Sequence, residues 1–398
     1  MIFSVGRIRR AIFLLLLSFV SLTQAGQSLS PRMHAQLTKA QTLMDTESWS
    51  EAQTFLNDLA DGVTQAYPKA LIIQSLGQIA IHQDNLKSAL KLFQQAYDLQ
   101  ALKAEQNLQL LHSIGQLHCG LDEWRLCREI LERWVTMAPE QASADDYIMI
   151  AQAFSMTEEW VSVIGPVNEA LQRRSNAPLS WYQLRVYAHS GQSKWRQSII
   201  AQQALLQSYP KQPDEWRRLV FFHLQREDHK LALASMRIPF QQGLLNTEKD
   251  YRQIAQLMLY NGVPYLAGAT LTKGFDNNVL TEAVDNLKLL GSAWLLAGEQ
   301  EKAKHVFSRL VAIDPQRRWM KQLAQLHIQT QSWQQAVEAL HAAQKLEPES
   351  KLDLMLGIAL INLQQYENAR LSLAKAAKDK SLKTKVENWL QYLIQIKV

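Results

Sequence analysis

The stretch that decides the fold is residues 282–377, which falls into three consecutive rows. The rows read EAVDNLKLLGSAWLLAGEQEKAKHVFSRLVAIDP (282–315), QRRWMKQLAQLHIQTQSWQQAVEALHAAQKLEP (316–348) and ESKLDLMLGIALINLQQYENARLSLAKAA (349–377). Each row holds two apolar stripes at helical spacing, separated by a short polar turn. Ala303, Ala336 and Ala369 are 33 residues apart, twice over. A fixed period of this length indicates a repeated helical hairpin.

Small residues mark where the two helices of each row approach each other. The first stripe contains Leu290-Gly291, Leu323-Ala324 or Leu356-Gly357, and the second stripe contains the periodic alanine. A small residue on each helix allows the axes to come near the lower end of the usual ~8–10 Å. Pro315 and Pro348 follow the second helices of their rows and stop them, because proline cannot continue a helix.

This pattern resembles the tetratricopeptide repeat, which places Gly or Ala at position 8, Ala at position 20 and Pro at position 32. The resemblance implies an all-α fold, a tetratricopeptide-type helical-hairpin solenoid wound as a right-handed superhelix. Walking back from the periodic alanine, we expect ten units, in residues 26–176 and 177–377, with soft points at 172–178 and 241–247. Residues 378–398 are expected to form a capping helix. Sustained period-two alternation is absent, so no sheet is predicted.

The first 25 residues are typical of a cleaved secretory signal peptide. Arg7, Arg9 and Arg10 precede the apolar run 11–20, and Thr23-Gln24-Ala25 provides small residues before a cut. The run is too short for a membrane span, which needs ~20 apolar residues. Removing the three arginines lowers the net charge from +5 to +2, which argues neither for nucleic acid nor for a membrane surface as partner. We therefore expect an exported protein from which the signal peptide, residues 1–25, is removed.

The two cysteines, Cys119 and Cys127, lie on opposite sides of one predicted turn. An oxidising compartment would allow a disulfide. Alternatively, Cys127 fills the small-residue position 20 as a buried thiol that acts as an alanine. His112 and His118 lie nearby in sequence, but the spacing fits no common metal site, so no metal is predicted.

Most of the eleven tryptophans are expected in the core. Trp49, Trp124, Trp160 and Trp333 fall at position 17, where the repeat often has an aromatic residue that packs across the turn. Trp195 lies off the template and is expected to be more exposed, together with Trp319 and Trp389. No hydrolase elbow, HExxH, Walker loop or dinucleotide-binding turn is present. We therefore predict a non-enzymatic protein without a cofactor.

The predicted partner-binding surface is the inner face of the first helices, which positions 5 and 9 line in tetratricopeptide folds. Position 9 is glutamine in six units: Gln41, Gln78, Gln116, Gln152, Gln256 and Gln325. Position 5 is basic in four consecutive units: Arg217, Arg252, Lys288 and Lys321. Glutamine amides can donate to and accept from a peptide backbone, and a basic row suits an acidic segment. The alternative interpretation is that the glutamines and the basic residues are ordinary solvent-exposed side chains that bind no partner.

The second half of the chain carries a closer likeness. WYQLRVYAHSGQSKWRQSII, QQGLLNTEKDYRQIAQLMLYNGVPYLAGATLTKGF, LGIALINLQQYENARLSLAKAA and VENWLQYL resemble the periplasmic repeat proteins that accompany TonB–ExbB–ExbD systems. The likeness covers about residues 177–396. It implies a periplasmic protein of a Gram-negative bacterium. The implied role is an accessory scaffold in TonB-dependent uptake across the outer membrane, with TonB, ExbB or ExbD components as partners. Two alternatives stay open: an envelope assembly factor or chaperone, and a module that serves polysaccharide synthesis or export.

Overall fold

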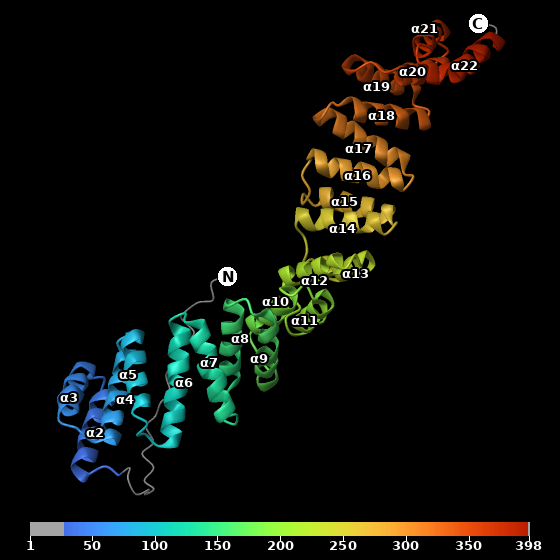
Figure 1. Cartoon of the computed structure of the whole chain (residues 1–398). Coiled ribbons are helices and arrows are strands. Elements are labelled where there is room, and N and C mark those ends of the chain that lie inside the picture. The colour runs from blue at the N-terminus through green and yellow to red at the C-terminus, as the bar shows by residue number, and fades with distance from the viewer. Residues whose placement is uncertain (1–27, 397–398) are drawn as a thin grey trace. The chain divides into compact units, whose positions relative to one another are not determined.

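The fold is all-α, as the sequence predicts, and its helices pack as consecutive hairpins of the tetratricopeptide type (Figure 1). A computed structural model describes residues 28–396, and no strand occurs within this range. The predicted signal peptide lies outside the described residues. The structure separates into two compact units, with the division between Tyr209 and Pro210. The residue-176 boundary suggested by the sequence therefore lies within the first unit.

The described part of each unit contains five hairpins, which are numbered one to ten along the chain. The helices of the first unit are α2 (Pro31–Asp45), α3 (Trp49–Asp61), α4 (Ala66–His82), α5 (Leu86–Asp98), α6 (Ala104–Gly120), α7 (Trp124–Met137), α8 (Ala144–Met156), α9 (Trp160–Arg173), α10 (Leu179–Ser190) and α11 (Trp195–Ser208).

The second unit continues the same alternation of first and second helices. Its helices are α12 (Pro213–Gln225), α13 (His229–Gln241), α14 (Glu248–Tyr260), α15 (Pro264–Asp276), α16 (Val284–Leu296), α17 (Gln300–Ile313), α18 (Arg317–Gln329), α19 (Trp333–Leu346), α20 (Ser350–Asn362), α21 (Tyr366–Ala376), the 3-10 turn η2 (Lys380–Leu382) and α22 (Lys383–Gln395). Helix α22 packs on α21 and buries Val386 and Leu393, so it covers the apolar side of hairpin ten.

All ten hairpins share one turn geometry between their two helices. The backbone N–H at position 16 donates to the carbonyl at position 11 over 2.7–3.1 Å, for example Ser48 to Leu43 and Gln365 to Leu360. This bond closes the C-terminus of the first helix in the Schellman arrangement, which requires a left-handed residue in between. Position 15 has positive φ in every hairpin, yet only Gly262 and Gly298 are glycines there. The turn therefore leaves a weak glycine signal in the sequence.

The common turn places the two helices of every hairpin in the same register. The second helix begins nine residues after position 8 in all ten hairpins. The position-20 side chains have 0% exposure throughout: Ala52, Ala89, Cys127, Val163, Ser198, Ala232, Ala267, Ala303, Ala336 and Ala369. A buried residue at this position lets the helices pack closely, as the alanine period predicts.

One sequence prediction is corrected in hairpin five. Trp195 is the first residue of α11, the place that Trp49, Trp124 and Trp160 occupy in their own hairpins, and it is half-buried like them. It therefore lies on the template rather than off it. The small residue three positions later is Ser198, and its hydroxyl donates to the Lys194 carbonyl at 3.0 Å. Because position 20 is serine and not alanine in hairpin five, the alanine period does not reveal the register of this hairpin.

We expect Gly77→Ala to destabilise the protein by about 1–3 kcal/mol through overpacking. A Cβ added at Gly77 would lie 2.3 Å from the ring of Phe93, which is fully buried and has little room to move. Gly62→Ala is the matched control, because its nearest neighbour would lie 3.9 Å away and its φ of −93° suits alanine. Chemical denaturation of both variants measures the difference, and equal stabilities would contradict the predicted close packing.

Candidate partner-binding surface

The four predicted basic residues lie on the first helices of hairpins six to nine, at the same register position. Arg217, Arg252, Lys288 and Lys321 belong to α12, α14, α16 and α18, and all four are half-buried. Arg217 and Lys321 reach carboxylates at the start of the next hairpin's first helix, Asp250 and Glu349. The row is thus aligned from hairpin to hairpin, but much of it is engaged in contacts within the protein.

Arg217 makes the strongest of these contacts. Its Nε donates to Oδ1 of Asp250 at 2.9 Å and its Nη2 donates to Oδ2 at 2.8 Å, while Nη1 reaches exposed Asp214 at 2.7 Å. Asp250 lies in the first turn of α14 and is fully buried. Two parallel bonds of this kind hold a carboxylate in a defined orientation. Arg217 therefore joins hairpin six to hairpin seven.

The carboxylate of Asp250 also caps its own helix. The Thr247 backbone N–H and hydroxyl donate to Asp250 Oδ2 at 3.0 and 2.7 Å, and the Asp250 N–H donates back to Thr247 Oγ1 at 3.3 Å. Burial by itself would raise the pKa of Asp250, but the bonds from Arg217 and Thr247 outweigh it and lower that pKa below its usual value. The same pair raises the pKa of Arg217. Both groups are charged at neutral pH.

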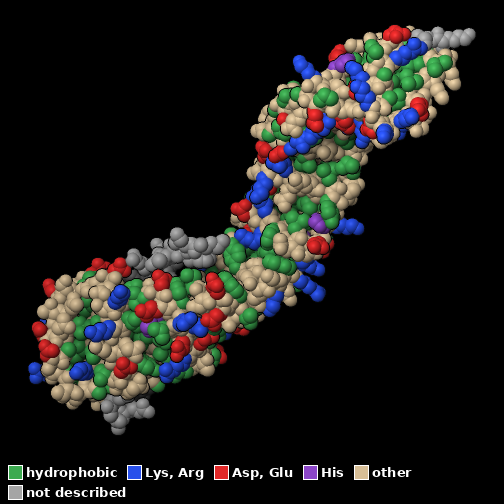
Figure 2. Space-filling view, turned by 45° about the horizontal axis from the view of Figure 1, so that its top comes forward, with side chains coloured by type: hydrophobic (Ala, Val, Ile, Leu, Met, Phe, Trp, Pro, Cys, Tyr) green, Lys and Arg blue, Asp and Glu red, His purple; other side chains and the backbone are tan. Residues whose placement is uncertain are grey.

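The other members of the basic row differ in how far they are neutralised. Lys321 Nζ donates to both carboxylate oxygens of Glu349, at 2.8 and 3.1 Å, and these bonds lower the pKa of Glu349. Lys288 donates to Asp285 in its own helix at 3.0 Å. Arg252 acts on Asp285 only through its charge, and within residues 28–396 it forms no ion pair. Figure 2 likewise shows basic side chains interspersed with acidic ones on the face in view.

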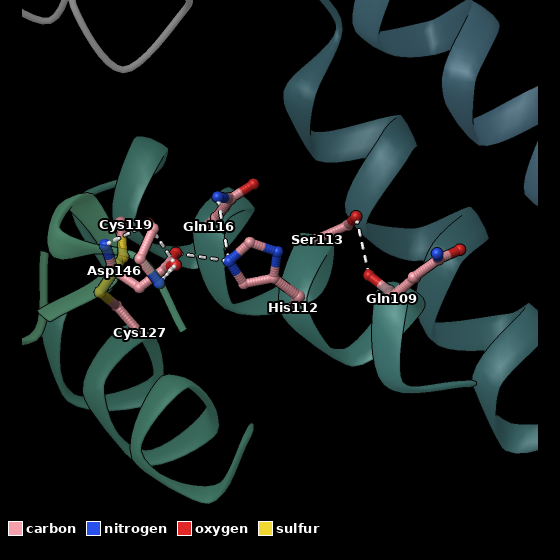
Figure 3. A network of polar contacts seen from close by, with 8 residues as sticks. Gln109, His112, Ser113, Gln116, Cys119, Cys127 and Asp146 are labelled. Carbon is pink, nitrogen blue, oxygen red and sulfur yellow. Dashed lines mark hydrogen bonds and ion pairs between the residues drawn. A yellow bond between two sulfur atoms is a disulfide. The ribbon is translucent and has the colours of Figure 1, made fainter. Parts of the chain in front are cut away.

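The first unit repeats this arrangement with histidine in place of arginine. His112 occupies position 5 of hairpin three, and its Nε2 lies 2.6 Å from Oδ1 of Asp146 in the first turn of α8 (Figure 3). Asp146 is buried and caps α8 together with Ser143, as Asp250 does with Thr247. Burial would raise the pKa of Asp146, but His112 and Ser143 lower it overall. His112 also stacks on Trp134, with ring centroids 4.0 Å apart.

The six predicted glutamines are exposed to different degrees. Gln256 and Gln325 are exposed in the second unit, whereas Gln116 is buried and directs its amide nitrogen at His112 Nε2, 3.2 Å away. Gln41 donates to Asp45 at 2.7 Å. Gln78 and Gln152 are half-buried, and Gln78 Nε2 is a buried donor without a partner in the structure. Solvent-facing glutamines of this row thus concentrate in hairpins seven and nine.

The residues around the cysteines are committed to other bonds. Cys119 and Cys127 form a disulfide that joins α6 to α7, with Cα atoms 4.9 Å apart. His118 Nδ1 lies 2.5 Å from Glu123, and His112 holds Asp146. Within the described part of the chain, no group of three or more His, Cys, Asp or Glu residues could hold a metal ion.

The acidic partners of the row were missed by reasoning from the sequence, although a signal for them exists. Asp146 and Asp250 follow Ser143 and Thr247 by three residues, which is the spacing of a helix-capping box. They also follow His112 and Arg217 by 34 and 33 residues, which is one repeat. Considering each basic residue together with the capping acid of the next repeat would have found both pairs.

The consecutive packing of helical hairpins gives this chain a solenoid fold of the tetratricopeptide type. No protein-family model and no curated protein matches the chain. Among solved structures, a tetratricopeptide repeat protein from Parabacteroides merdae has a TM-score of 0.38 and 12% identity, over 66% of this chain and 99% of that one. YrrB, a tetratricopeptide protein with an unusual peptide-binding site, has a TM-score of 0.36 and 11% identity, over 42% and 82%. MamA has a TM-score of 0.34 and 18% identity, over 41% and 95%.

We expect Asp250→Asn to cost about 1–3 kcal/mol at neutral pH, because it removes charged hydrogen bonds to a buried group. The folded-state pKa of Asp250 is lowered, so its contribution is present above its unfolded pKa of ~4 and is lost as pH falls below that value. The stability difference between wild type and variant should therefore shrink in acid. Denaturation at several pH values measures it.

Asp214→Asn is the matched control for this experiment, because Asp214 binds the same arginine from an exposed position. An exposed ion pair contributes little, so this variant should differ from wild type by less than about 1 kcal/mol. A buried-site variant that is no less stable than the control would contradict the bridging role of Asp250.

We expect reduction of the Cys119–Cys127 disulfide to lower the stability by about 2–3 kcal/mol, because a bridge over eight residues restricts the unfolded chain. The double variant Cys119→Ala, Cys127→Ala keeps the usual small residue at position 20. Its melting temperature should lie below that of the oxidised protein and should not respond to reductant. A wild-type melting temperature that reductant leaves unchanged would argue against the bridge.

Proposed function

We propose that this protein is a periplasmic scaffold that holds an extended segment of a partner protein along the first helices of hairpins seven to nine. The observation that carries the proposal is the combination of Arg252 with Gln256. Arg252 is the member of the basic row for which residues 28–396 provide no ion pair, and exposed Gln256 lies one turn further along α14. A guanidinium and an amide on one helix face can bind a side-chain carboxylate and a backbone group of one peptide.

The neighbouring hairpins extend this surface with polar side chains. Ser292 on α16 and Gln325 on α18 occupy position 9, as Gln256 does, and both are exposed. Stacked hairpins place these groups at successive steps, which suits an extended segment better than a folded domain. Because Arg217 and Lys321 already hold carboxylates, the partner's acidic group is expected at the middle of the row, near Arg252.

The proposed partner is a periplasmic segment of a TonB–ExbB–ExbD system, and the proposed role is accessory to TonB-dependent uptake. Support for this assignment comes from the resemblance of residues 177–396 to repeat proteins that accompany such systems. The expected signal peptide and the disulfide are compatible with an oxidising compartment outside the cytoplasm. Within residues 28–396, no helix is both long enough and apolar enough to cross a bilayer.

The test is site-specific photocrosslinking in the native host. A photoreactive amino acid at Gln256 should crosslink to TonB, ExbB or ExbD, whereas the same probe at Lys273 on α15 should not. Arg252→Glu should lower the yield at least fivefold because it reverses the charge that the acidic segment meets, and Lys273→Glu is the charge-matched control. Raised salt should weaken capture by the unmutated protein as well.

Two outcomes separate the parts of this proposal. Crosslinks at Gln256 could join assembly or polysaccharide-export proteins and still weaken in Arg252→Glu. That result would support the binding surface and reject the TonB assignment. Equal crosslinking of wild type and Arg252→Glu, with helix content unchanged, would show that the row is only a solvated face.

Fractionation and intact-mass analysis should find a periplasmic chain that begins near Gly26.

A further inference from the structure

Hairpin five departs from the others at a position that is normally part of the core. Position 7 is a buried leucine or isoleucine in eight hairpins: Leu76, Ile114, Ile150, Leu219, Ile254, Leu290, Leu323 and Leu356. Hairpin one has the exposed Lys39 there, at the start of the array. Hairpin five, the last hairpin of the first unit, has Arg185, which is half-buried. A charge at this place needs a partner, because burial penalises an unpaired ion.

The protein supplies no anionic partner for Arg185 in the described residues. Its Nε is buried without a hydrogen-bond partner, and its guanidinium carbon lies 5.8 Å from the centroid of the Tyr182 ring. No ion pair involves Arg185 between residues 28 and 396. Burial lowers the pKa of this arginine, and only Tyr182 acts in the opposite direction.

His189 lies one helical turn after Arg185, on the same face of α10. Its Nδ1 is also buried without a partner. Burial lowers the pKa of His189, and the charges of Arg185 and Lys194 lower it further. Arg185 and Lys194 are both cations, and no carboxylate contributes to this shift.

Three other hairpins also have a histidine at position 11. In hairpin three, His118 lies 2.5 Å from Glu123 at position 16. In hairpin six, burial lowers the pKa of His223, and the charge of Asp228 at position 16 opposes that shift. In hairpin nine, position 16 is Ser332, and burial lowers the pKa of His327. The backbone N–H of position 16 donates to the carbonyl of position 11 in all four hairpins, over 2.7–3.1 Å. The turn is the same, but hairpin five has the cation Lys194 where hairpins three and six have an acid and hairpin nine has a serine.

We propose that Arg185, His189 and Lys194 form a binding site for an oxyanion, a carboxylate or phosphate group of a ligand. An external anion would occupy the place that Glu123 fills in hairpin three. It would accept from the unpartnered Arg185 and His189 nitrogens, and Lys194 would contribute its charge. Because an anion favours the protonated imidazole, binding would raise the pKa of His189. This site lies in the first unit and does not depend on the function proposed for α14–α18.

The experiment follows the His189 ring by NMR in the full mature chain while anions are added at constant ionic strength. The probes are sodium acetate, inorganic phosphate and an acidic peptide with a blocked C-terminus, each compared with sodium chloride. Saturable binding that raises the pKa of His189 is expected for at least one oxyanion. Preference for the peptide over phosphate would identify a carboxylate ligand, and the reverse preference would identify a phosphate ligand.

Three variants make the test specific. Arg185→Leu restores the residue type of eight other hairpins, so it should fold, melt higher in oxyanion-free buffer and bind at least tenfold more weakly. Lys194→Glu supplies an internal acid and should abolish the anion-induced shift while raising the pKa of His189 without ligand. Arg196→Leu removes an exposed charge from the same hairpin and should bind like wild type.

The proposal is overturned if no oxyanion shifts the His189 resonance beyond the sodium chloride control. It is equally overturned if Arg185→Leu and Arg196→Leu weaken binding to the same extent, because general positive charge would then explain the effect. Stability of Arg185→Leu equal to that of wild type in oxyanion-free buffer would show that Arg185 is not an uncompensated charge.

Discussion

The structure depends on the backbone bond that closes each hairpin. The N–H at position 16 donates to the carbonyl at position 11 in all ten hairpins. This bond requires a left-handed residue at position 15 and fixes a nine-residue interval between position 8 and the start of the second helix. Eight of these left-handed residues are not glycine, so the conformation costs free energy at each one. Packing of the two helices offsets that cost.

A constant turn places each register position at an equivalent point of every hairpin, so the electrostatics depend on which side chains meet there. In hairpins three and six, position 5 reaches the first turn of the next hairpin, where an acid already caps the helix. Asp146 and Asp250 therefore serve two structures at once, the start of their own helix and the contact with the preceding one. In the sequence, the basic residues at position 5 look like a ligand-binding row. In the structure, two of them, Arg217 and Lys321, bind carboxylates of the adjacent hairpin.

The same constancy makes exceptions informative. Among residues 28–396, Arg252 has no ion pair of the kind that Arg217 and Lys321 form. Arg185 takes the place of an apolar residue that eight hairpins keep. In a repeat array, a charged side chain without an ion pair can be compared with the side chains at the same register position in the other hairpins. Lys194 opposite His189, set against Glu123 opposite His118, is such a comparison. These departures define the two surfaces at which we expect ligands.

The sequence by itself determined the hairpin repeat and its register over most of the chain. The 33-residue alanine period and the apolar stripes report close helix packing, which only small residues permit, and this constraint is local to each hairpin. The register was obscured in hairpin five, where Ser198 replaces alanine at the close contact. Only the tertiary structure decided which charges are available to a partner. Arg217 and Arg252 occupy the same repeat position, but one meets a buried carboxylate and the other does not. That difference arises from the first turn of the next hairpin, about 33 residues away in sequence and adjacent in space.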